Sequence, residues 1–156
     1  MTIFLPCLLQ RWPTDASDGA TIRGSLNTWQ DVRRDVVRNL EWLLNTEAPS
    51  KFGEQEPPEA VANSVLCFGI SPYSGKPQSA MKADEVAWSL RERIIAFETR
   101  IDHNSLEVSL ADKSGTHHFN KMRFAVRGLL RSDPYPQEFV VQTEIDMETG
   151  QAKVTG

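Results

Sequence analysis

The sequence predicts an α+β fold in which two main helices pack against a small antiparallel sheet of three to four strands. Two long segments, residues 29–45 and 79–97, carry apolar residues at the spacing of one helix face. From Ser105 onward, apolar and polar residues alternate instead, as they do in strands with one buried face. Because the helical segments come first and the strands follow as a block, we expect both helices on one face of an antiparallel sheet.

The composition is that of one ordinary soluble domain, with 156 residues, 40% hydrophobic residues and 24% charged residues. A net charge of -4 argues against a nucleic-acid partner. Cys7 and Cys67 lack metal-ligand spacing, and we expect buried free thiols in a reducing compartment. The apolar start has no leading positive charge and is too short to span a bilayer, so we expect a cytoplasmic protein without direct membrane insertion.

The chain divides into an N-terminal apolar segment with a loop, residues 1–28, and a single domain, residues 29–156. Arg11 and Trp12 close the apolar cluster of the first segment, which comprises Ile3, Phe4, Leu5, Leu8 and Leu9. Residues 13–27 have the composition of a loop. An apolar terminus of this kind either packs against the domain or is kept for a partner.

The first predicted helix begins after Thr28, which with Asp31 resembles an N-terminal capping box, and runs to about Asn45. Arg33 lies at the edge of the buried stripe and needs a polar partner, whereas Trp42 lies on the far side. The stripe itself comprises Trp29, Val32, Val36, Leu40, Leu43 and Leu44.

A long acidic connector, residues 46–63, follows this helix, and connectors of that length are usually functional or mobile. The next apolar run, residues 64–69, fits either a strand or a helical turn, between which periodicity does not decide. The second predicted helix spans about Ser79 to Phe97. Its buried stripe comprises Ala83, Val86, Ala87, Leu90, Ile94 and Phe97.

Three predicted strands and a short fourth, from Gln151 to Thr155, form the sheet. The inward positions of the first three are Leu106, Val108 and Leu110, then Met122, Phe124, Val126, Gly128 and Leu130, then Phe139, Val141, Thr143 and Ile145. The outer face carries a basic row (Lys121, Arg123, Arg127 and Arg131) beside acidic residues (Glu138, Glu144 and Asp146). Since no aromatic residues interleave the basic row, we expect cross-strand ion pairs rather than a nucleic-acid surface.

Glu98 and Arg100 lie where the second helix runs into the sheet. On a continuing helix their side chains would point in nearly opposite directions, whereas on an extended chain they would point the same way. A carboxylate and a guanidinium presented together make a two-pronged docking point for a partner. A solvated ion pair at the helix end is the alternative.

The sequence supports no catalytic, metal or cofactor site. No two carboxylates are placed as acid and nucleophile, and there is no nucleophile elbow, phosphate loop or zinc signature. His117 and His118 are adjacent, and adjacent histidines in a strand point in opposite directions, which disfavours metal binding. The apolar terminus, Trp42 and the Glu98–Arg100 pair fit an assembly component better than an enzyme.

Four stretches together resemble the TssE family of type VI secretion system baseplate subunits, which is related to the wedge protein of contractile phage tails. They are residues 8–11, residues 40–46, residues 64–70 with Ser74-Gly75, and residues 97–101. The family pattern has Glu-Pro-Arg where this chain has Glu98, Thr99 and Arg100, so the proline that fixes the backbone is absent here. The pattern also usually has Asn-Tyr at Cys67-Phe68 and arginine at Glu47.

The resemblance implies a structural, non-enzymatic subunit without a cofactor, which joins the baseplate wedge and helps to start sheath assembly at the cytoplasmic face of the inner membrane. It implies that Glu98 and Arg100 contact the other wedge subunits, TssF and TssG. We expect Leu8, Leu9 and Arg11 to contact a partner as well. Because the sheet resembles the strand-exchange part of sheath proteins, these are candidate partners through an open edge strand.

Two other functions stay open at this point. Members of the family have been labelled lysozyme-like, which would make the chain a peptidoglycan hydrolase, although no placed carboxylate pair supports that activity. The fold is also similar to that of a small anti-adaptor that blocks regulated proteolysis. Such a regulator would not need the apolar start with Leu8, Leu9 and Arg11.

Overall fold

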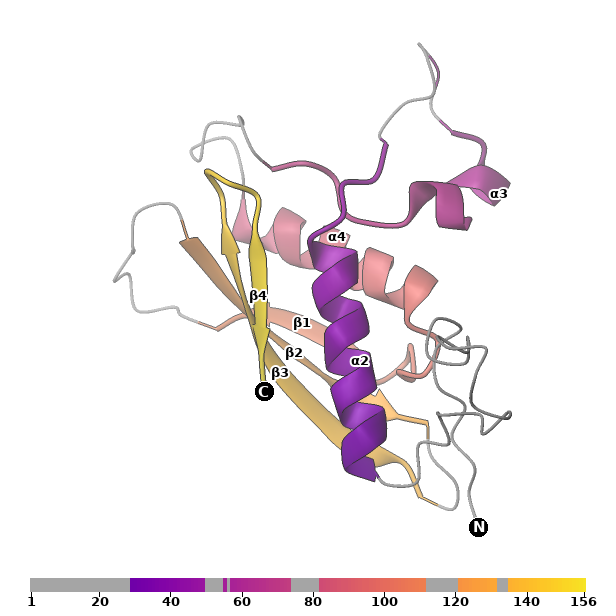
Figure 1. Cartoon of the computed structure of the whole chain (residues 1–156), viewed down its shortest axis with the longest axis vertical. Coiled ribbons are helices and arrows are strands. Elements are labelled where there is room, and N and C mark those ends of the chain that lie inside the picture. The colour runs from indigo at the N-terminus through magenta and orange to yellow at the C-terminus, as the bar shows by residue number, and fades with distance from the viewer. Residues whose placement is uncertain (1–28, 50–54, 56, 74–81, 112–120, 132–134) are drawn as a thin grey trace, which may run out of the picture.

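The computed structural model describes residues 29–49, 55, 57–73, 82–111, 121–131 and 135–156. Its elements are the helices α2 (Trp29–Leu44), α3 (Glu59–Ala62) and α4 (Ala83–Phe97), the 3₁₀ turn η1 (Val65–Cys67), and the strands β1 (Glu107–Leu110), β2 (Lys121–Leu130), β3 (Gln137–Asp146) and β4 (Ala152–Thr155). The strands form one antiparallel sheet in the order β1-β2-β3-β4, and α2 and α4 lie across one of its faces (Figure 1). The predicted α+β architecture is confirmed.

The central pair of strands sets the register of the sheet. β2 and β3 pair from Lys121 opposite Asp146 to Leu130 opposite Gln137, so that residues on one face of both strands turn toward the helices. These inward residues are almost completely buried, among them Phe124, Val126, Phe139, Val141 and Ile145. The alternation in the sequence therefore identified the buried face correctly.

The outer face of the sheet carries the predicted ion pairs. Glu144 accepts hydrogen bonds from Lys121 Nζ at 2.8 Å and from Arg123 Nε at 2.7 Å. Arg127 lies opposite Val140 on β3 and opposite Glu107 on β1, and Arg131 Nη2 lies 3.9 Å from Asp102 Oδ1. Acidic residues therefore lie beside the whole basic row on a solvated face, as expected for a structural role.

Both main helices bury the stripes that their spacing predicts. In α2 the buried apolar residues are Val32, Val36, Leu40, Leu43 and Leu44, and in α4 they are Val86, Ala87, Leu90 and Ile94. Arg33, at the edge of the α2 stripe, finds the polar partner that it needs, because its Nη2 donates to Val140 O at 3.3 Å. The predicted start of the second helix at Ser79 lies outside the described residues, and α4 begins at Ala83.

The apolar run of residues 64–69, which fitted either a strand or a helical turn, forms the turn η1. The residue after this run, Ile70, is hydrogen-bonded to the chain that follows α2. Ile70 N donates to Thr46 O, and Ala48 N donates to Ile70 O, both at 2.9 Å. Gly69 has φ of +122°, and a Cβ added there would lie 2.2 Å from Thr46 O. Only glycine permits this backbone conformation and this close approach.

Asn45 covers part of the outer edge of β4. Its Nδ2 donates to Ala152 O at 2.8 Å, and its Oδ1 accepts from Ala152 N at 2.9 Å. The side chain therefore satisfies both backbone groups of Ala152, much as a neighbouring strand would, and blunts the edge at this point. None of the described helices has the length and apolar character that crossing a membrane requires.

Candidate partner-binding site

A tight turn after α4 brings Glu98 and Arg100 together. The helix ends as Glu98 N donates to Ile94 O at 2.8 Å, and Ile101 N then donates to Glu98 O at 3.2 Å, which closes a four-residue turn. Arg131 N donates to Arg100 O at 2.8 Å, so the turn lies beside the end of β2. The two side chains are presented together, and a turn brings them together rather than either a continuing helix or an extended chain.

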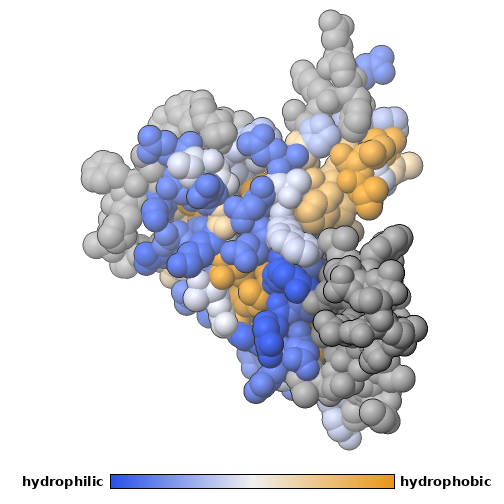
Figure 2. Space-filling view, in the orientation of Figure 1, coloured by the Kyte–Doolittle hydropathy of each residue, from blue (hydrophilic) through white to orange (hydrophobic). Residues whose placement is uncertain are grey.

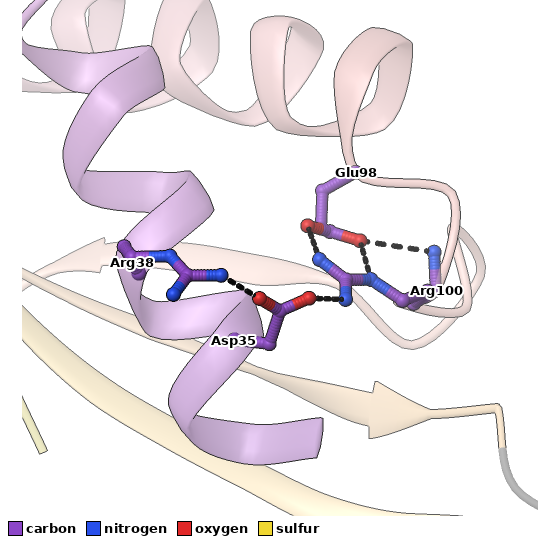
Figure 3. A network of polar contacts seen from close by, with 4 residues as sticks. All are labelled: Asp35, Arg38, Glu98 and Arg100. Atoms are coloured by element: carbon purple, nitrogen blue, oxygen red, sulfur yellow. Dashed lines mark hydrogen bonds and ion pairs between the residues drawn. The ribbon is translucent and has the colours of Figure 1, made fainter. Parts of the chain in front are cut away.

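Two carboxylates and two guanidinium groups form one network at this turn (Figure 3). Arg100 donates from Nε to Glu98 Oε1 and from Nη2 to Glu98 Oε2, both at 2.7 Å, in a bidentate pair. Its Nη1 donates to Asp35 Oδ2 of α2 at 2.6 Å. The other oxygen of Asp35, Oδ1, accepts from Arg38 Nη2. Asp35 therefore joins the turn to α2.

The two acids lie beneath the two arginines. Glu98 and Asp35 are only 3% and 2% exposed, whereas the side chains of Arg100 and Arg38 are 22% and 38% exposed. Burial alone would lower the pKa of Arg100, but the hydrogen bonds and charges of Glu98 and Asp35 outweigh it and raise the pKa above its ordinary value. The alternative of a solvated ion pair at the helix end is therefore wrong, because Glu98 is buried. The part of the network that reaches the surface is the guanidinium groups of Arg100 and Arg38.

Trp42 continues this site along α2. The guanidinium carbon of Arg38 lies 5.2 Å from the centre of the Trp42 ring, within range of a cation–π interaction. Trp42 itself is 42% exposed. One large aromatic side chain is thus held at the surface beside a fixed cation.

A third arginine, Arg93 of α4, holds η1 against the helix. Its Nε donates to Gly69 O at 2.7 Å, its Nη2 donates to Cys67 O, and its guanidinium lies 4.8 Å from the Phe97 ring. Val65 and Leu66 of η1 remain 82% and 64% exposed. Figure 2 shows the apolar patch that they contribute to, at the position of α3 and η1. η1 therefore presents exposed apolar side chains while Arg93 holds its backbone against α4.

Of the residues predicted to contact a partner, the structure brings Glu98 and Arg100 together. Leu8, Leu9 and Arg11 lie outside the described residues, as do His117 and His118. Sequence reasoning missed Asp35, whose signal was an acid at the edge of the buried stripe with an arginine three residues later. The part of the chain that the structure describes contains no cluster of three metal-binding side chains.

Comparison with known proteins identifies the family. The sequence model described as baseplate wedge protein gp25 matches residues 30–135. The chain belongs to the baseplate wedge protein gp25 family. TssE belongs to the same family, so the family predicted from the sequence is confirmed. No curated protein and no solved structure matches the chain.

The match covers three of the four stretches that carry the resemblance, namely residues 40–46, 64–70 and 97–101. It contains all of α2 except Trp29, the turn after α4 and the whole Glu98–Arg100–Asp35–Arg38 network. A wedge protein is a structural component of a phage-tail-like baseplate and interacts with other baseplate proteins. The network thus lies within the part of the chain that defines this structural family.

Proposed function

We propose that the chain is the TssE subunit of a type VI secretion system baseplate wedge, that it binds TssF and TssG, and that it helps to start sheath assembly at the cytoplasmic face of the inner membrane. The observation that carries the proposal is the Glu98–Arg100 pair, kept in a gp25-family domain despite the loss of the proline between them. A pair held this firmly at a domain surface suits a contact that forms without rearrangement.

Arg100 is the member of the pair that reaches the partner. A guanidinium has five N–H donors, and Glu98 and Asp35 accept from three of them. The side chain is 22% exposed, so the remaining N–H groups can meet acceptor oxygens of a wedge subunit. Glu98, which is buried, contributes by fixing the direction of Arg100. A hydrogen bond to a charged group of this kind contributes about 1.5–3 kcal/mol.

The N-terminal segment is a second proposed contact, through Leu8, Leu9 and Arg11. Its apolar side chains need cover, and arginine is one of the residue types enriched at interfaces. Deletion of residues 1–12 should weaken binding to the wedge subunits and leave the melting temperature of the domain unchanged. Full binding by the shortened chain would contradict this role.

Co-production of the chain with TssF and TssG of the same organism tests the proposal. The three proteins should co-purify through a tag on this chain, because a wedge subunit assembles with its neighbours before the sheath forms. The matched control is a chain of the same fold with Arg100→Ala, which should be recovered without the partners. Absence of TssF and TssG from the wild-type preparation would contradict the proposed function.

A peptidoglycan hydrolase is the alternative that the lysozyme-like label suggests. The structure brings Glu98 and Asp35 together, and guanidinium groups occupy both oxygens of each. Neither is placed to protonate a glycosidic oxygen. Purified protein should therefore release no more fragments from peptidoglycan than buffer does. Turnover that a single Asp or Glu substitution abolishes would support the hydrolase instead.

A further inference from the structure

We propose that the partner-binding surface does not stop at Arg100 but continues along α2 through Arg38 to Trp42, with Asp35 as the positioning residue that joins its two halves. The proposal rests on the proposed function, because the partner is the same wedge subunit. We call the exposed side chains of Arg100, Arg38 and Trp42 the arginine–tryptophan strip.

The geometry of α2 places the strip on one side of the helix. Asp35, Arg38 and Trp42 are spaced by three and then four residues, so their side chains follow one another on the same face. Asp35 accepts from Arg100 through one oxygen and from Arg38 through the other. Two like-charged guanidinium groups are thus held side by side by one carboxylate (Figure 3).

The composition of the strip is that of a binding hot spot rather than of an ordinary surface. Tryptophan and arginine are the residue types most enriched among hot spots. Trp42 is 42% exposed although Arg38 lies against its ring. A half-exposed indole with a fixed neighbour loses little conformational freedom on binding.

The charges indicate what kind of partner surface fits. Within these four residues, the charges of Asp35 and Glu98 balance those of Arg38 and Arg100. A carboxylate on the partner would be repelled by the two buried carboxylates, Asp35 and Glu98, that lie directly behind the guanidinium groups. Neutral oxygen acceptors, such as backbone or amide carbonyls, avoid that repulsion. We therefore expect a partner surface with carbonyl oxygens opposite the arginines and an apolar side chain opposite Trp42.

Affinity measurements with the TssF–TssG subcomplex test the strip. Arg38→Ala and Trp42→Ala should each weaken binding by about tenfold or more, as truncation of a hot-spot residue does. The matched controls are Arg123→Ala on the outer face of the sheet and Trp88→Ala on α4, where Trp88 is 65% exposed. Both controls should bind as the wild type does, because neither residue belongs to the strip.

A separate measurement tests Asp35 as a positioning residue without the partner. In a background with Phe at the other three tryptophan positions, Asp35→Asn should change the fluorescence of Trp42, because Arg38 is released from its fixed place over the ring. If Asp35→Asn does not fold, Arg38→Lys provides the same test, since lysine keeps the charge but not the planar fork. Arg38→Lys should change the fluorescence of Trp42 as Asp35→Asn does, and it should bind the TssF–TssG subcomplex as weakly as Arg38→Ala does.

Each outcome separates the two proposals. If Arg100→Ala weakens binding while Arg38→Ala and Trp42→Ala do not, the arginine–tryptophan strip is not the partner-binding surface, and the proposed function stands. If the wild type itself fails to bind the TssF–TssG subcomplex, the proposed function and the proposed strip are both wrong. Binding should also change little between about 0.05 and 0.5 M salt, because the charges of the four network residues balance. A steep loss of affinity over that range would overturn the carbonyl-bearing partner surface.

Discussion

The sequence predicted that Glu98 contacts a partner, but its surroundings in the fold give Glu98 a structural role. Its carboxylate is buried and accepts a bidentate pair from Arg100. Glu98→Gln should lower the free energy of unfolding by about 2–4 kcal/mol, because it removes the bidentate counter-charge of a half-buried guanidinium and leaves Arg100 paired with Asp35 alone. Glu144→Gln, on the outer face of the sheet, is the control and should cost less than about 1 kcal/mol. Equal costs in urea denaturation would contradict the structural role of Glu98.

Thr99 occupies the second position of the turn, where proline is favoured. Within the described residues no acceptor faces its N–H group, and Glu98 before it has φ of -115° and ψ of 78°, outside the helical region that proline disfavours. Thr99→Pro should therefore raise the free energy of unfolding by about 0.4–1 kcal/mol. Thr99→Ala, which adds no backbone constraint, is the control. Loss of the folded state on Thr99→Pro would show that this turn differs from the Glu-Pro-Arg turn of the family.

The sequence predicted the pairing of Glu98 with Arg100 because the two residues are neighbours along the chain. It did not reveal Asp35, which lies 65 residues from Arg100 and meets it only because α2 packs beside the turn. Such a contact depends on the relative placement of two elements, and no local pattern encodes that placement. The structure is therefore needed to identify polar partners of a predicted site that lie far away in the sequence.

At the scale of elements, Gly69 fixes the segment between η1 and the chain after α2. An alanine Cβ would collide with Thr46 O and would also strain a backbone at φ of +122°. Gly69→Ala should lower the melting temperature by several degrees, as a change of about 2 kcal/mol does in a domain of this size. Gly128→Ala is the milder control, because its Cβ would lie 3.1 Å from the Ile101 Cγ2 methyl and at ordinary contact distance, 3.5 Å or more, from its other neighbours. An unchanged melting temperature for Gly69→Ala would contradict the close approach.

The outer face of the sheet should respond to acid through Glu144. Hydrogen bonds from Lys121 and Arg123 lower the pKa of Glu144 to about 2, below its ordinary value of 4.5. A group with a lowered pKa stabilises the fold above its ordinary pKa, and this contribution disappears as the pH falls toward the folded value. The wild type should thus melt above Glu144→Gln at pH 6, and the difference should shrink between about pH 4.5 and pH 2. A constant difference across this range would show that the ion pairs do not stabilise the sheet.

Periodicity was sufficient to predict the helices and strands because each presents one continuous buried face. The run from Ser64 to Gly69 had no such face, since η1 exposes Val65 and Leu66 and buries Cys67. Its shape depends instead on Arg93, which bonds carbonyl oxygens of the run from α4, 24 and 26 residues away. A segment held by distant polar contacts could not be assigned from local spacing.

For the whole molecule, the family and the fold place a structural wedge domain in a phage-tail-like baseplate. The functional question is then which surface meets its neighbours. The sheet edge at β4 is blunted at Ala152 by Asn45, so strand addition by a sheath protein is hindered at that position. The turn after α4, with Arg100 at its surface, remains the contact that the account depends on.

The dissociation constant of Arg100→Ala for the TssF–TssG subcomplex, measured beside its melting temperature, tests this account most directly. Arg123→Ala serves as the control for removing an arginine elsewhere. Arg100→Ala should melt at a lower temperature than the wild type, because it leaves the buried Glu98 carboxylate without its partner, but it should still be folded at the temperature of the binding measurement. There it should bind at least about tenfold more weakly than the wild type, whereas Arg123→Ala should bind normally. A folded Arg100→Ala variant that binds TssF and TssG as tightly as the wild type would contradict this account.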